Sequence, residues 1–190
     1  MQSAQIGNMR KILHAGGFTL IELLIVVALI GIIAAIAVPG LLRVRESGNE
    51  ASAIASLRVV NSAQQVYMSS CSNGFYAASL VVLNDPPSSG GTPFISPDLG
   101  AAVVVKSGYR LTMAAGSEAT SALVDGCNAS GTAASLATSY YATNQPLMGG
   151  ITGTRWFFTN ALGALFASTA DDFDAETIGN AKPSTGVSLQ

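Results

Sequence analysis

Residues 17–46 read GFTLIELLIVVALIGIIAAIAVPGLLRVRE, and this stretch decides how the chain is organised. From Leu23 to Leu42 it holds 20 consecutive positions without an ionisable or amide side chain. A helix of that length spans the hydrocarbon core of a bilayer. A cleaved secretory signal has a shorter apolar stretch followed by small residues at the cut site. We therefore expect one membrane-spanning helix that is not removed behind this stretch.

One carboxylate, Glu22, lies at the start of the apolar stretch. The Leu, Ile and Val residues between Leu23 and Leu42 favour insertion by roughly 4 to 8 kcal/mol in total, against roughly 3 for one buried acid. Insertion therefore wins, and Glu22 is left in need of a partner. A cut between Gly17 and Phe18 would place a new α-amine one turn before Glu22, at the positive end of the helix dipole.

The hexapeptide GFTLIE (residues 17–22), followed by a long apolar helix, resembles the prepilin processing site of type IV pilins and type II secretion pseudopilins. The resemblance implies that a membrane aspartyl peptidase cuts after Gly17 and methylates the new amine of Phe18. It also implies that Glu22 neutralises the N-terminus of a neighbouring subunit during assembly. The alternative is a plain signal-anchor helix with Glu22 near the headgroups, which leaves Gly17, Phe18 and the basic leader unexplained.

The orientation in the membrane does not follow from charge, because Arg10 and Lys11 before the apolar stretch are matched by Arg43 and Arg45 after it. The positive-inside rule gives a tie. The resemblance implies a cytoplasmic leader and a single pass through the inner membrane, with the remainder periplasmic before assembly and extracellular in the pilus afterwards.

Pro39 and Gly40 fall within the apolar stretch. Proline removes one backbone donor and clashes with the carbonyl one turn earlier, so we expect a kink or a locally opened helix. The alternative is a proline that a membrane helix simply tolerates. In the resembled pilins this neighbourhood is where the helix loosens on entering the filament.

The helical pattern continues beyond the apolar stretch. Apolar residues recur at spacings of three and four, with polar residues opposite, which predicts an amphipathic helix to about residue 70. The apolar positions are Ala53, Leu57, Val60, Ala63 and Tyr67. We expect four parts: a leader removed at 1–17, a transmembrane and filament-core half-helix at 18–43, an amphipathic half at 44–70, and a globular domain at 71–190.

Strand patterns follow in the C-terminal part. The candidates are residues 101–106, 109–115, 139–143, 155–159 and 165–168, with turns at 107–108 and 160–163. We expect an α+β fold of the type IV pilin kind, in which the long N-terminal helix packs on an antiparallel sheet of about four strands.

Two cysteines, Cys71 and Cys127, both follow the membrane stretch. In an oxidising periplasm they are expected to form a disulfide, which by the chain-entropy model stabilises by roughly 4 kcal/mol. The alternative is a pair of unlinked buried thiols.

The sequence carries no sign of an enzyme or of a cofactor. The only histidine, His14, lies in the leader, so the mature chain lacks the commonest general base and metal ligand. A net charge of −2 gives no basic surface for nucleic acid. The acidic cluster Asp171, Asp172, Asp174 and Glu176 lacks the spacing of a calcium loop. We read it as a solvated tail and predict no metal site, although some pseudopilins bind calcium in this region.

The expected function is a structural subunit of a type IV pilus that serves adhesion, twitching motility or DNA uptake. Its implied partners are other copies of itself, the prepilin peptidase, the assembly platform with its ATPase motors, and inner-membrane lipid. The alternatives are a pseudopilin of a type II secretion or competence system, a low-abundance minor pilin or adhesin, and, more remotely, a membrane-tethered enzyme.

Overall fold

A computed structural model describes residues 17–169 and 186–189 of the chain. Residues 1–16 of the predicted leader and the acidic cluster at 171–176 lie outside these residues. The fold divides into an N-terminal unit, residues 1–41, and a globular unit, residues 42–190. Helix α1, Leu20–Ser70, runs through the boundary without interruption.

The helix continues through Pro39 and Gly40, so the expected kink remains a prediction. In the first half of α1 the large apolar side chains, from Leu20 to Val44, are exposed. The helix is long and apolar enough to cross a membrane. In the second half, the apolar positions predicted from the periodicity (Ala53, Leu57, Val60, Ala63 and Tyr67) are all buried.

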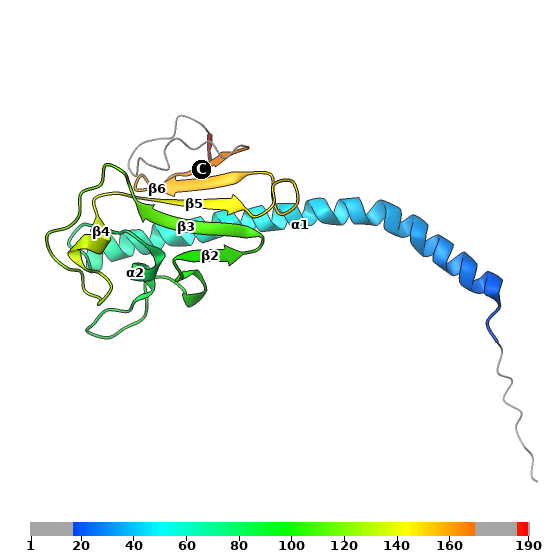
Figure 1. The fold of residues 1–190 in the computed structure, drawn as a ribbon, viewed down its shortest axis with the longest axis horizontal. Coiled ribbons are helices and arrows are strands. Elements are labelled where there is room, and N and C mark those ends of the chain that lie inside the picture. The colour runs from blue at the N-terminus through cyan, green and yellow to red at the C-terminus, as the bar shows by residue number, and fades with distance from the viewer. Residues whose placement is uncertain (1–16, 170–185, 190) are drawn as a thin grey trace, which may run out of the picture. The chain divides into compact units, whose positions relative to one another are not determined.

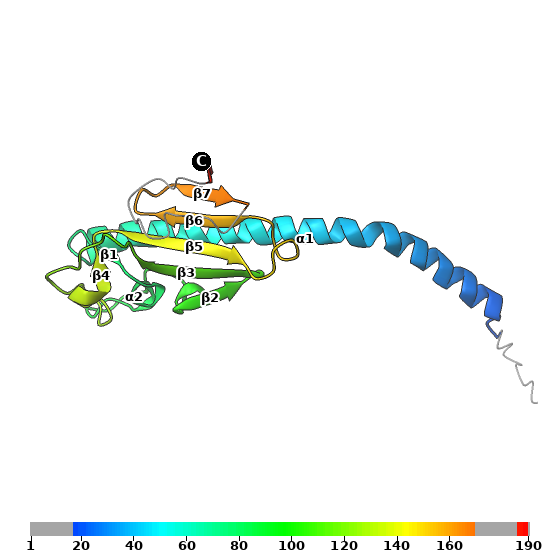
Figure 2. The same cartoon turned by 45° about the horizontal axis from the view of Figure 1, so that its top comes forward.

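The globular unit lays a six-stranded antiparallel sheet along the second half of α1, in the order β2-β3-β5-β6-β7-β8 (Figures 1 and 2). The strands are β2 Val103–Lys106, β3 Tyr109–Ala115, β5 Tyr140–Pro146, β6 Trp156–Asn160, β7 Leu165–Ser168 and β8 Val187–Leu189. The α+β class and the antiparallel sheet are confirmed. The sheet is wider than the expected four strands, partly because the short β8 pairs with β7.

Smaller elements close the end of the unit near residue 71. Strands β1 Tyr76–Ala77 and β4 Leu136–Ala137 pair with each other, and α2 Leu80–Asn84 lies beside them. Two short 3-10 helices, Pro97–Leu99 and Ala133–Ser135, complete the set. The core between helix and sheet is filled by Leu57, Val60 and Tyr67 from α1 with Leu111, Tyr140 and Phe157 from the strands.

Both predicted hairpin turns are present. Ser107 and Gly108 have φ values of 49° and 71°, the left-handed conformation that a two-residue hairpin turn requires. Between β6 and β7, the Gly163 amide donates to the Asn160 carbonyl, and Gly163 has φ 74°. These turns fix the register of β2 with β3 and of β6 with β7.

Candidate functional site

The predicted processing site lies immediately before α1. Gly17, Phe18 and Thr19 are outside the helix, and Phe18 is 87% exposed. A Cβ added to Gly17 would meet nothing within 4 Å. Gly17 and Phe18 are therefore both exposed among the described residues, and a small substitution at Gly17 has no steric consequence there.

Glu22 forms a capping box with Thr19. One carboxylate oxygen, Oε2, accepts a hydrogen bond from the Thr19 amide at 2.9 Å and from its hydroxyl at 2.7 Å. In return, the Thr19 hydroxyl accepts from the Glu22 amide at 3.3 Å. This reciprocal arrangement satisfies free amides at a helix start. The T-x-x-E pattern typical of a capping box is present in the sequence at residues 19–22, so Thr19 could have been predicted from it.

The capping box leaves the charge of Glu22 without a cation. Neither of the ion pairs among the described residues involves Glu22, and both contacts from Thr19 fall on the same oxygen. The second oxygen, Oε1, therefore stays available to an ammonium group. Chemically, the site is a carboxylate held in place by hydrogen bonds at the N-terminal end of an apolar helix. This carboxylate can pair with one cation.

A second carboxylate, Glu50, fastens α1 to the sheet. Its Oε1 accepts hydrogen bonds from the Thr154 amide at 2.9 Å and hydroxyl at 3.0 Å, and its Oε2 accepts from Arg155 Nε at 2.9 Å. The Arg155 guanidinium also pairs with it at 2.7 Å. Burial disfavours the charged form, but these donors outweigh it and hold the Glu50 pKa below its ordinary value.

The contacts of Glu50 with Thr154 and Arg155 are here called the clamp. Asn49 adds to it by donating from Nδ2 to the Thr152 carbonyl at 2.9 Å. The loop between β5 and β6 is thus tied to the first turn of the packed half of α1. Sequence reasoning missed this clamp, because its partners lie more than a hundred positions apart and no local pattern links them.

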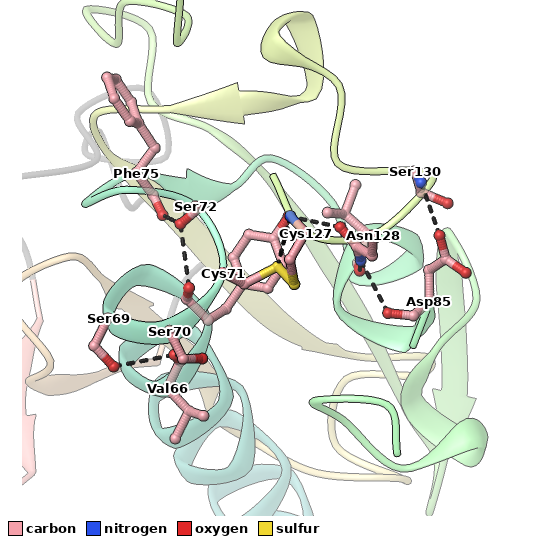
Figure 3. Close-up of a disulfide and its surroundings, with 12 residues drawn as sticks. Val66, Ser69, Ser70, Cys71, Ser72, Phe75, Asp85, Cys127, Asn128 and Ser130 are labelled. Atoms are coloured by element: carbon pink, nitrogen blue, oxygen red, sulfur yellow. Dashed lines mark hydrogen bonds between the residues drawn. A yellow bond between two sulfur atoms is a disulfide. The ribbon is translucent and has the colours of Figure 1, made fainter. Parts of the chain in front are cut away.

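The other end of the packed half is closed by the disulfide between Cys71 and Cys127, whose Cα atoms are 4.8 Å apart (Figure 3). The Cys127 amide also donates to the Cys71 carbonyl at 3.0 Å. The bridge therefore joins the end of α1 to the segment between β3 and β4.

Asn128 organises the polar contacts beside the disulfide. Its Nδ2 donates to the carbonyls of Val82 at 2.7 Å and Asp85 at 2.9 Å, and its Oδ1 accepts from the Tyr67 hydroxyl at 2.9 Å. Burial, together with the charge of Asp85, raises the pKa of Tyr67 to about 12. The Asn128 side chain is buried and fully used, so the Asn128-Ala129-Ser130 sequon is closed to modification in the folded unit.

Comparison with known proteins points to the same N-terminal segment. The prokaryotic N-terminal methylation motif matches residues 13–38, which include the Gly17–Phe18 bond and Glu22. No solved structure matches the chain.

Two curated relatives share this region. The type IV major pilin protein PilA of Myxococcus xanthus is 45% identical over 53 residues, which cover 28% of this chain and 24% of that protein. The type IV wide pilus major component PilA4 of Thermus thermophilus is 46% identical over 54 residues, 28% of this chain and 41% of that protein. The match spans less than half of either relative. The N-terminal segment of this chain is therefore similar to that of type IV pilins, and a long helix whose second half packs on an antiparallel sheet is consistent with that family.

Proposed function

We propose that this chain is the structural subunit of a type IV pilus, cut after Gly17, methylated on the new amine of Phe18 and assembled through its apolar half-helix. The observation that carries the proposal is the pairing of an exposed apolar helix with one carboxylate that forms no ion pair among the described residues. In the chain alone, the large apolar side chains from Phe18 to Val44 are exposed to solvent, an arrangement that needs lipid or other helices to cover it.

Glu22 supplies register in this proposal. After cleavage, the amine of Phe18 remains a cation whether methylated or not, and the open Oε1 of Glu22 in a neighbouring copy is a fitting acceptor. An unpaired charge is costly in apolar surroundings. The axial position in which the amine of one subunit meets the carboxylate of its neighbour is therefore favoured over positions in which the two helices are shifted and both charges are unpaired. Both relatives are named as major pilus components, which supports a major pilin over a pseudopilin or a minor adhesin.

The testing experiment separates the charge of Glu22 from its capping role. Glu22→Gln keeps a side chain that can complete the capping box but removes the charge. Thr19→Ala does the reverse. We expect Glu22→Gln and Glu22→Ala to insert in the inner membrane normally yet yield no sheared filaments, while Thr19→Ala still assembles. Normal piliation with Glu22→Gln would overturn the neutralising role.

The processing step is tested at Gly17. Because Gly17 has open space around it, Gly17→Ala perturbs recognition by the peptidase without perturbing the fold. We expect an uncut precursor in membranes. Mature chains of this variant whose N-terminal sequence still begins at Phe18 would contradict the assigned cut.

A separate measurement, the amount of the wild-type chain in sheared filaments, tests the minor-pilin alternative. Trace amounts would favour that alternative.

A further inference from the structure

The globular unit carries two loops whose large apolar side chains are exposed instead of being buried in its core. The first, here called the distal loop, holds Leu123, which is 95% exposed, and Val124, which is 63% exposed. The second, here called the proximal loop, joins β5 to β6 and exposes Leu147, Met148 and Ile151, the last at 62%. Large apolar side chains that are this exposed and adjacent mark interaction surfaces in soluble domains.

The two loops lie at opposite ends of the same unit. The proximal loop is tied to α1 at Asn49 and Glu50, whereas the distal loop leads into Cys127, which is bridged to Cys71. Between Glu50 and Cys71 the helix advances about 32 Å at 1.5 Å per residue. Figures 1 and 2 agree, since both draw the segment before β4 at the end of the domain away from the β5–β6 loop.

The charges around the two loops are of opposite sign. Near the proximal loop are three exposed arginines, of which Arg45 lies one turn before Asn49 and Arg110 pairs in register with Gln145. Together with Arg43 they outnumber the half-buried Glu46. None of the three belongs to an ion pair among the described residues.

The distal end is acidic. Glu118 and Asp125 flank the distal loop, and Asp85 accepts a hydrogen bond from the Ser130 amide beside it. No lysine or arginine occurs in residues 71–90 or in residues 116–139, which lie toward this end. Apolar and charge complementarity therefore coincide between the two ends of the globular unit.

We propose that the distal loop of one copy docks on the proximal loop of the next copy, with Leu123 and Val124 against Met148 and Ile151 and the acidic end facing the arginines. A contact between two different surfaces of the same molecule does not close on itself and generates an open filament. The inference rests on the proposed function and deepens it, because it assigns a second contact between copies that is separate from the apolar helices and Glu22.

Disulfide trapping tests the contact in assembled filaments. Cys71 and Cys127, the two cysteines of the sequence, are already bridged, so the introduced cysteines supply the only free thiols. We expect filaments of a chain that carries both Leu123→Cys and Ile151→Cys to give a ladder of oligomers on non-reducing gels after mild oxidation. Each single variant should stay monomeric, since a head-to-tail contact does not bring two copies of residue 123 together. Dimers from a single variant, or filaments without a ladder, would overturn the inference while the proposed function stands.

A matched control uses the tip of the β6–β7 hairpin. Leu162 is 54% exposed and belongs to neither loop, so Leu123→Cys with Leu162→Cys should give no ladder. As a second measurement, Leu123→Ser with Val124→Ser should lower the yield of sheared filaments at least several-fold at equal membrane level, and Leu162→Ser should leave it unchanged. Equal yields for both would count against the contact. Absence of filaments from the wild-type chain would overturn the proposed function itself, and the inference with it.

Discussion

The two halves of α1 are one continuous helix with opposite relations to the rest of the chain. In the first half the apolar side chains are exposed, and the single carboxylate, Glu22, forms no ion pair with any residue that the structure describes. In the second half the apolar positions are buried and the carboxylate Glu50 is held by Thr154 and Arg155. The comparison shows where each half finds its partner. The second half is covered by its own chain, whereas the first half is left uncovered by the described residues and, in the proposed function, is covered by lipid or by other subunits.

Removal of the disulfide should have the largest effect on the covered half. Cys71→Ala with Cys127→Ala frees a loop with a sequence separation of 56, and the chain-entropy model gives a loss of about 4 kcal/mol. We expect the denaturant midpoint of the globular unit to fall accordingly, measured by fluorescence of Trp156, the only tryptophan. An unchanged midpoint would show that the contacts around Asn128 alone close this end.

A pair of leucine variants tests the two halves directly. Leu57 is fully buried, so Leu57→Ala should destabilise the globular unit by about 3 kcal/mol. Leu29 is exposed in the first half, so Leu29→Ala should leave that unfolding transition within about 0.5 kcal/mol. The full-length chain in detergent serves for both. A similar loss from both variants would break the distinction between the halves.

The charge of Glu50 should contribute a smaller, pH-dependent amount. Glu50→Gln removes the charge-assisted bonds and should cost about 2 kcal/mol at neutral pH. Because the folded-state pKa of Glu50 is lowered, its contribution is present above the ordinary value of 4.5 and is lost as pH falls through the folded value. The difference between wild type and variant should therefore shrink in acid. A difference that stays constant from pH 7 to pH 3 would argue against this ion pair.

The smallest effect is expected at the Tyr140 hydroxyl, which donates to Asn61 Oδ1 at 2.8 Å. The Thr159 hydroxyl lies 2.9 Å from the same oxygen and 2.9 Å from the Ala164 carbonyl, so its single proton is within reach of the Asn61 oxygen in Tyr140→Phe. We expect a loss of about 1 kcal/mol in thermal unfolding. A loss several times larger would mean that Asn61 needs both donors to hold α1 on the sheet.

What could be predicted from the sequence was local. The helix followed from its periodicity, and β3 Tyr109–Ala115 and β7 Leu165–Ser168 followed from short β-prone runs beside glycine-containing turns. The three-residue β8 carries no such signal and forms because β7 offers it an edge. The role of Glu50 could not be predicted either, because its partners Thr154 and Arg155 lie more than a hundred positions away in the sequence. Thr19 was within reach, since its capping pattern spans four positions.

In the proposed filament, the disulfide would also limit how far each subunit can lengthen under tension. It joins the end of α1 to a segment that lies 56 positions further along the chain. If the sheet were torn away from the helix under tension, the chain between the cysteines could not straighten, and about 190 Å of extended polypeptide would be withheld. The maximum extension of each subunit in such a filament would therefore be smaller with the disulfide than without it, and the filament would recover its resting length from this smaller extension.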